Sequence, residues 1–133
     1  MATVFSKIVA GEIPCHRIAE DEEFFAFLDI HPMAEGHTLV VPKKEIDYLF
    51  DLDNNALGRM MAFSKTIARA LERAIPCKRI GLTVIGLEVP HAHIHLVPLQ
   101  KESDLFFGNP KLEKTPEELA QTAAKIRGKL TIF

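Results

Sequence analysis

In the stretch Val89-Pro90-His91-Ala92-His93-Ile94-His95-Leu96-Val97-Pro98, three of the six histidines of the chain alternate with small or aliphatic residues. Strict alternation of this kind predicts a β-strand with two different faces. Side chains at positions i, i+2 and i+4 of a strand point the same way, so the three imidazoles should share one face. A proline near each end suits the ends of a strand better than its interior.

Three interpretations compete for this row of histidines. The simplest is a solvated or hydrogen-bonded face without chemistry, which is the default for a single histidine but unusual for three in register. The second is an open catalytic zinc site made by His91, His93 and His95 with a water molecule. The third is nucleophilic catalysis, in which one histidine attacks and its neighbours position it and steer protons. The alternation alone does not choose between the last two.

Length and composition are typical of a soluble globular protein. We expect one domain over residues 1–133, because this length is enough to bury a core. The formal net charge of −2 gives no general attraction to nucleic acid or to an anionic membrane. No apolar run approaches the length of a membrane span. The start of the chain lacks a signal-peptide pattern, and Cys15 and Cys77 are far apart, so we expect free thiols and a cytoplasmic location.

Short runs of β-forming residues precede and follow a long helical pattern. We expect four strands besides the histidine strand, at residues 15–20, 24–29, 36–42 and 79–86. The run at 79–86 has little polar content, which predicts a central, well-covered strand. It would form a hairpin with the histidine strand, because only residues 87–90 separate the two.

Helix signals are clear at three places. A single turn at residues 5–10 is followed by Gly11, which suits the left-handed conformation that ends many helices. Asp53 can cap a long amphipathic helix that runs to about residue 75. Thr115-Pro116-Glu117-Glu118 is a capping box that begins a last helix, ending near residue 127. The whole order predicts an α+β fold, with a mostly antiparallel sheet of about five strands, one long central helix and a C-terminal helix.

Two features lie outside these elements. Phe106 and Phe107 are adjacent in a polar loop, which suggests that they dock onto the body of the protein or onto a partner chain. Glu88 precedes His91 by three residues. Its carboxylate either orients or acidifies a histidine or is an exposed loop acid, and the sequence favours neither interpretation.

The histidine row resembles the signature of the histidine triad (HIT) family, in which three histidines alternate with apolar residues and two apolar residues close the motif. Here the motif is His91-Ala92-His93-Ile94-His95-Leu96-Val97. Three earlier blocks resemble the Hint-like branch of the family, in the same order: Phe-Ser-Lys-Ile-Val-Ala-Gly-Glu-Ile-Pro at 5–14, Ala-Phe-Leu-Asp-Ile-His-Pro at 26–32 and Gly-His-Thr-Leu-Val-Val-Pro-Lys at 36–43. The resemblance covers roughly residues 4–98 and implies a HIT-like fold.

This resemblance implies a nucleotide hydrolase or transferase that acts at the α-phosphate of a nucleoside phosphoramidate or a (di)nucleoside polyphosphate. It implies that His93 is the nucleophile and forms a covalent nucleotidyl-histidine. His95 would contact the α-phosphate and the leaving group. His91 and His37 would support and orient the nucleophile. A neutral imidazole is a good nucleophile, and a neighbouring histidine can donate to phosphoryl oxygens, so the spacing suits this chemistry.

The same resemblance implies a nucleotide site and a dimer. Asp29 would bind the ribose hydroxyls, with Ile30 beside it, since one carboxylate can accept from two hydroxyls. The base pocket would be lined by four apolar residues: Phe5, Ile8, Ile13 and Phe27. An apolar, aromatic pocket is expected to prefer a purine without distinguishing adenine from guanine. The family usually forms a homodimer whose sheet continues across both subunits.

The segment before the triad departs from the Hint-like pattern. Only Gly86 matches, and Leu87 and Glu88 replace the Gln and Ser that help to hold the phosphate, so Gly86 and Glu88 are kept as nucleotide-binding candidates. An anionic Glu88 is unfavourable beside a phosphate, although a protonated one could act as an acid toward the leaving group. The N-terminal cysteines that hold zinc in some relatives are missing, so no metal or cofactor is expected. The alternatives to this enzyme are a nucleotide-binding or partner-binding module and the three-histidine zinc hydrolase.

Overall fold

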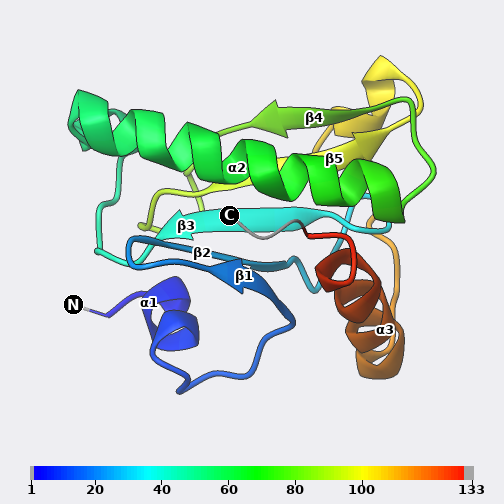
Figure 1. Cartoon of the computed structure of the whole chain (residues 1–133), viewed down its shortest axis with the longest axis horizontal. Coiled ribbons are helices and arrows are strands. Elements are labelled where there is room, and N and C mark those ends of the chain that lie inside the picture. The colour runs from blue at the N-terminus through cyan, green and yellow to red at the C-terminus, as the bar shows by residue number, and fades with distance from the viewer. Residues whose placement is uncertain (1, 131–133) are drawn as a thin grey trace.

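Five antiparallel strands form one sheet, in the order β1-β2-β3-β5-β4 (Figure 1). The computed structural model describes residues 2–130. The strands are β1 (Arg17–Glu20), β2 (Phe24–Leu28), β3 (Thr38–Pro42), β4 (Arg79–Thr83) and β5 (Ile94–Leu99). The helices are α1 (Val4–Val9), α2 (Asn54–Ala74) and α3 (Pro116–Arg127), with short 3-10 turns at Leu49–Asp51 and Glu102–Leu105. The predicted α+β fold is confirmed.

The two faces of the sheet bury different sets of side chains. Along β2, Phe24, Ala26 and Leu28 join the larger core, which also takes residues of α2 and α3. Phe25 and Phe27 point the other way, into a smaller cluster with Phe5 of α1. The alternation of β2 therefore serves two cores, and every residue of this strand is buried.

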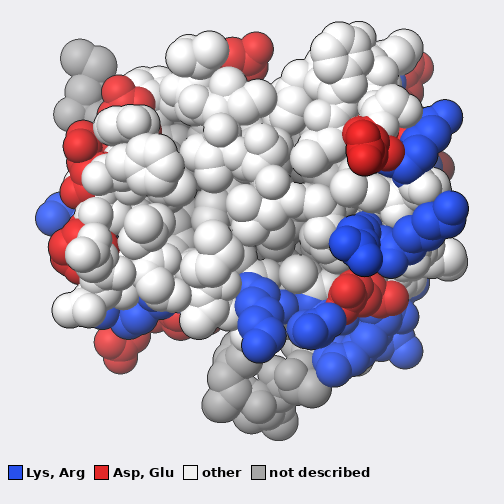
Figure 2. All heavy atoms as spheres, turned by 90° about the horizontal axis from the view of Figure 1, so that it is seen from above, with Lys and Arg blue, Asp and Glu red and all other residues white. Residues whose placement is uncertain are grey.

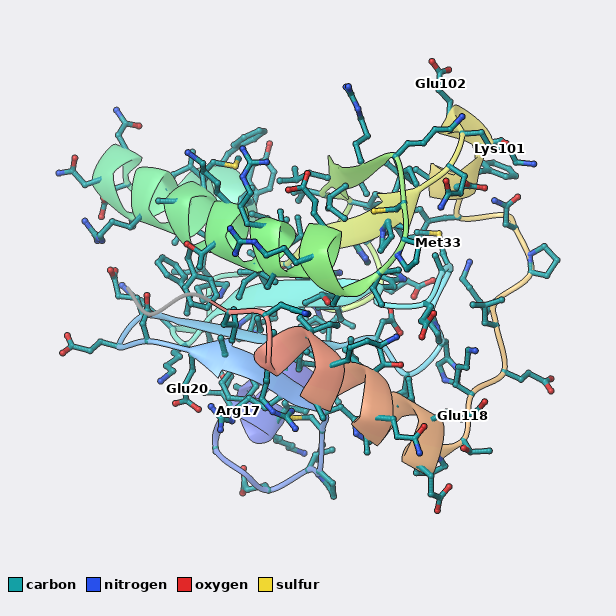
Figure 3. All side chains as sticks on the ribbon, turned by 45° about the vertical axis from the view of Figure 1, so that its right-hand side comes forward. Arg17, Glu20, Met33, Lys101, Glu102 and Glu118 are labelled. Atoms are coloured by element: carbon teal, nitrogen blue, oxygen red, sulfur yellow. The ribbon has the colours of Figure 1, made fainter. Side chains whose placement is uncertain are left out.

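Both long helices begin where their capping residues predict. The carboxylate of Asp53 accepts the backbone N–H of Ala56 at 2.8 Å and caps α2. Thr115 and Glu118 form the reciprocal capping box of α3, and Figure 3 shows Glu118 at the start of that helix. The predicted bounds of both helices are confirmed to within one residue. No helix among residues 2–130 is long and apolar enough to cross a membrane.

The structure corrects two predictions about the histidine strand and its neighbour. β5 begins only at Ile94, because the backbone N–H of Ala92 donates to Ile46 in a loop (2.6 Å) rather than to a strand. The strand predicted at 79–86 is wrong in both length and position. It ends at Thr83 and lies at the edge of the sheet, where Leu82 is 42% exposed. The apolar side chain of Leu82 therefore lies on an exposed surface, not in a central strand.

Candidate active site

A cleft of about 370 Å³ lies beside the histidines, on the sheet face opposite α2. The alternation of residues 92–96 produces this arrangement, because Ala92, Ile94 and Leu96 enter the larger core while His93 and His95 face the cleft. The lining residues are Phe5, Asp29, Leu39, Ile85, Gly86, Leu87, Glu88, Val89, His93, His95 and Phe107. Segments from both halves of the chain therefore meet at one site.

His93 is held in one orientation by the backbone of the same segment. Its Nδ1 lies 2.8 Å from the carbonyl oxygen of His91. A carbonyl only accepts, so Nδ1–H donates, and in the neutral ring Nε2 keeps its lone pair. The rings of Phe5 and His93 pack in a T-shaped contact at a centroid distance of 5.0 Å. His93 thus presents an unprotonated nitrogen at the cleft.

His37 and His95 form a second hydrogen-bonded pair. The backbone N–H of Met33, in the loop between β2 and β3 (Figure 3), donates to Nδ1 of His37 at 3.0 Å. Nε2 of His37 must then carry the proton and donate to Nδ1 of His95, 3.0 Å away. This leaves the proton of His95 on Nε2. The pair places a proton donor next to the lone pair of His93, whose ring centroid lies 4.9 Å from that of His95.

Burial keeps these imidazoles uncharged. It lowers the pKa of His93, although the hydrogen bond to the His91 carbonyl opposes the shift. Burial, and then the neighbouring His93 and His37, lower the pKa of His95 to about 3. Burial also lowers the pKa of His37, against the opposing effect of Asp29. At pH 7 all three rings are therefore neutral, as the hydrogen-bond directions require.

His91 is fully buried and does not line the cleft. Its Nε2 lies 2.7 Å from the carbonyl oxygen of Pro42, and its Nδ1 lies 2.7 Å from the hydroxyl of Thr3. Both ring nitrogens are therefore occupied by hydrogen bonds. The ring anchors the segment before β5 to the end of β3.

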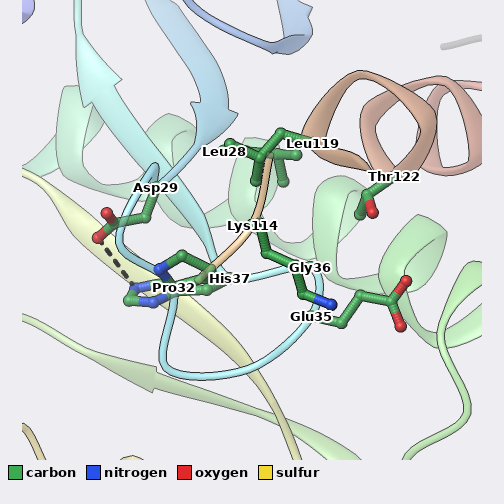
Figure 4. A pocket seen from close by; sticks show the side chains of 9 residues that line it. All are labelled: Leu28, Asp29, Pro32, Glu35, Gly36, His37, Lys114, Leu119 and Thr122. Carbon is green, nitrogen blue, oxygen red and sulfur yellow. Dashed lines mark ion pairs between the residues drawn. The ribbon is translucent and has the colours of Figure 1, made fainter. Parts of the chain in front are cut away.

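Of the eight residues predicted for nucleotide binding, four line the cleft: Phe5, Asp29, Gly86 and Glu88. Asp29 accepts the backbone N–H of His31 at 2.8 Å, and its other oxygen lies 3.7 Å from Nε2 of His37 (Figure 4). Gly86 has φ +73°, a conformation that favours glycine. Gly86 and Glu88 belong to one continuous lining segment, residues 85–89.

The other four lie outside the cleft. Phe27 is buried beneath Phe5, at a ring distance of 5.6 Å, and Ile8 packs against the same cluster. Ile13 is half-buried, and Ile30 is 57% exposed. The structure thus brings Phe27 and Ile8 behind the cleft wall and leaves Ile30 facing solvent.

Several lining residues were not predicted: Leu39, Ile85, Leu87, Val89 and Phe107. Phe107 packs edge-on against His95 with ring centroids 4.8 Å apart. The pair of adjacent phenylalanines in a polar loop was the available signal, and one of the two does dock onto the body of the protein. Leu39 could have been found from its spacing of two residues from His37, which puts both on one face of the strand predicted at 36–42.

The hydrogen bonds that the histidines already make do not fit a bound metal ion. Among residues 2–130, one group of three candidate ligands lies close together, namely Asp29, His37 and His95. A metal-bound imidazole normally donates its other N–H to an acceptor. Nδ1 of His37 instead accepts an N–H from Met33, so a metal on Nε2 would require an imidazolate. The predicted alternative of zinc on the triad fails similarly, since both nitrogens of His91 are engaged.

Comparisons with known proteins point to one family. Residues 10–102 match the family model of the HIT domain. The adenosine 5′-monophosphoramidases of Saccharomyces cerevisiae and Schizosaccharomyces pombe are 34% and 32% identical, over 97% and 98% of this chain and 83% and 99% of theirs. The crystal structure of a HIT-like protein from Bartonella henselae has a TM-score of 0.84, with 32% identity over 96% of both chains. From the match to residues 10–102, which include the histidine row and all five strands of the sheet, we conclude that this chain belongs to the histidine triad family.

Proposed function

We propose that this protein is a nucleoside 5′-phosphoramidate hydrolase in which His93 is the nucleophile. The observation that supports this most strongly is the bond from His93 Nδ1–H to the carbonyl of His91 (2.8 Å) in a buried, neutral ring. That bond directs the lone pair of Nε2 toward the cleft. The two yeast relatives at 34% and 32% identity are named adenosine 5′-monophosphoramidases, which supports the same substrate class.

In the proposed first step, Nε2 of His93 forms a bond to the α-phosphorus and the P–N bond to the amine breaks. The departing amine takes its proton from solvent, and Nε2–H of His95, which lines the cleft, donates a hydrogen bond to the phosphoryl oxygens. The nucleotidyl-imidazole of His93 is then cationic, and neutral His95 lies beside it with the two ring centroids 4.9 Å apart. In the second step water attacks phosphorus and releases a proton to solvent, and the nucleoside monophosphate leaves neutral His93.

Around this centre we assign binding roles to the other cleft residues. Asp29 has its side chain 23% exposed at the cleft, so it can accept from the ribose hydroxyls. Phe5 and Leu39 give the cleft an apolar wall on which a purine can lie. His37 and His91 act behind the cleft, on His95 and His93 respectively.

The test is release of nucleoside monophosphate from a nucleoside 5′-phosphoramidate. Wild-type protein should turn over, His93→Ala should not, and His31→Ala, at an exposed histidine, should match wild type. Rapid quench with mass spectrometry should find one nucleotidyl group on wild-type protein. Nucleotide binding without turnover in wild type would instead favour a binding module. Turnover that a chelator abolishes would favour zinc catalysis.

We also propose a homodimer formed through β4. Its outer edge is unpaired in this chain, and the apolar side chains around it are exposed: Tyr48, Phe50, Leu82, Val84, Ile85 and Leu87. Figure 2 shows uncharged residues over the middle of this face and Lys and Arg gathered toward one rim. An exposed apolar patch next to a free strand edge is typical of an interaction surface. Sedimentation should give a dimer for wild type and a monomer for Leu82→Arg, and a monomeric wild type would exclude the proposal.

The single-domain organisation and the cytoplasmic location stay predictions.

A further inference from the structure

Thr3 joins the N-terminal helix to the histidines, and it has no role in the proposed hydrolysis steps. Its hydroxyl lies 2.7 Å from Nδ1 of His91, although the two residues are 88 positions apart. The same hydroxyl oxygen accepts the backbone N–H of Ser6 at 3.0 Å, which caps α1. One side chain therefore serves both the end of a helix and a fully buried imidazole.

The direction of this contact follows from the partners of His91. The carbonyl oxygen of Pro42 can only accept, so Nε2 of His91 is the protonated nitrogen. In the neutral ring Nδ1 must accept, and the O–H of Thr3 donates to it. The carboxylate of Glu45 lies near this group, and its pKa is lowered chiefly by a hydrogen bond with Ser6. Glu45 offers His91 no proton, because it is a carboxylate at neutral pH.

We propose that Thr3 is a positioning residue for the nucleophile, an inference that rests on the proposed function. With Thr3 and Pro42 at its two nitrogens, the ring of His91 has a single orientation. The carbonyl of that same residue holds Nδ1–H of His93. Without the Thr3 hydroxyl, a buried nitrogen loses its partner, and His91 turns or shifts to regain one. The carbonyl then holds His93 less firmly, and Nε2 faces the cleft for less of the time.

Phe5 strengthens this connection from the same helix. Its ring contacts His91 and His93 edge-on, with centroids 5.9 and 5.0 Å away. Phe5 follows Thr3 by two residues, so the capping hydroxyl and the aromatic ring move together with α1. A shift of α1 would disturb both histidines at once.

The chain provides a matched control for the capping role of Thr3. Thr115 caps α3 with the same reciprocal capping box, and its hydroxyl accepts the N–H of Glu118 at 3.1 Å. Within residues 2–130, none of its hydrogen bonds has a histidine as partner. Thr3→Val and Thr115→Val therefore both remove a helix cap, but only the first removes a contact with the triad.

The experiment compares kcat and KM for a nucleoside 5′-phosphoramidate in wild type, Thr3→Val, Thr3→Ser and Thr115→Val. We expect Thr3→Val to lower kcat roughly tenfold with little change in KM, as one lost hydrogen bond to the catalytic array predicts. Thr3→Ser keeps the hydroxyl and should restore kcat. Thr115→Val should keep the wild-type kcat. Equal losses in Thr3→Val and Thr115→Val, or no rescue by Thr3→Ser, would overturn the inference.

A second measurement does not depend on turnover. Long-range ¹⁵N–¹H NMR should find the proton of His91 on Nε2 and that of His93 on Nδ1 in wild type, and Thr3→Val should change the resonances of both rings. Thr3→Ala is the substitute if the valine variant does not fold. If wild type shows no turnover, the proposed function fails, but the NMR result still tests the contact. Unchanged ring resonances in the Thr3 variants would refute the positioning role.

Discussion

Lowering the pH from 7 to 5 should destabilise the protein through His95. The folded state holds this ring neutral, with a pKa of about 3 compared with an ordinary value of 6.5. Below pH 6.5 the unfolded chain binds a proton at this position that the folded protein does not bind. The free energy of unfolding therefore rises with pH in this window, so the stability present above pH 6.5 is lost as the pH falls toward 3.

The expected size follows from these two values. Each pH unit between them changes the free energy of unfolding by about 1.4 kcal/mol for one proton. Integrated from pH 7 to 5, His95 alone contributes a loss of about 2 kcal/mol, because titration of the unfolded chain begins gradually around pH 6.5. The lowered pKa values of His93 and His37 add to this loss in the same direction.

Urea unfolding at the two pH values measures this difference, with His95→Asn as the variant. The Asn amide oxygen replaces Nδ1 and can accept the proton of His37 Nε2, so the buried donor keeps a partner. The variant should lose about 2 kcal/mol less than wild type between pH 7 and 5. His31→Asn removes an exposed imidazole and should keep the wild-type loss. Protein concentration must be the same throughout, because dimerisation would contribute to stability. An equal loss in wild type and His95→Asn would refute the reasoning.

Three further substitutions test the cleft and the fold. Glu88→Gln should lower kcat and shift its pH profile if Glu88 is an acid toward the leaving group, and unchanged kinetics would exclude that role. Phe107→Ala removes the ring that packs on His95 and should raise KM roughly two- to tenfold, whereas Phe106→Ala, at a 62% exposed side chain, should match wild type in the same assay. Gly36→Ala should lower the free energy of unfolding by about 1–2 kcal/mol in urea, because Gly36 has φ +89° and a Cβ there would meet side-chain atoms at 3.1 and 3.3 Å. Gly58→Ala, in α2 with no such neighbour, should raise it by about 0.5–1 kcal/mol.

Local patterns predicted most of the secondary structure. The caps Asp53 and Thr115 and the helical periodicity set α2 and α3, because these signals act within one turn. The alternation around His93 likewise predicted that His93 and His95 share a face, but the prediction that His91 shares it is wrong, because His91 precedes β5 and does not line the cleft. The position of β4 was not predictable in this way. Its apolar residues resemble those of a buried strand, and only the order of strands shows that it lies at the edge.

The contacts of the candidate site depend on pairings that the sequence does not reveal. His37 meets His95 because β3 pairs with β5, with Leu39 opposite His95. The resemblance to a family predicted that His37 supports the triad, but the residues themselves did not. The sequence gives no signal for the role of Met33. Met33 acts through its backbone N–H, which every residue type except proline supplies.

Four buried histidines lie in one cluster, and backbone groups determine which ring nitrogens donate and which accept. Three backbone groups have fixed hydrogen-bonding roles: the N–H of Met33 only donates, and the carbonyls of His91 and Pro42 only accept. Each one assigns the proton of a neighbouring ring, so the tautomers follow from the path of the chain. Among the described side chains, Ser64 Oγ is the one buried polar atom without a partner, so every ring nitrogen buried in this cluster is either bonded or open to the cleft. A histidine held in this way needs no carboxylate to orient it, and substitutions that move these backbone groups should impair the proposed catalysis even when all four histidines remain.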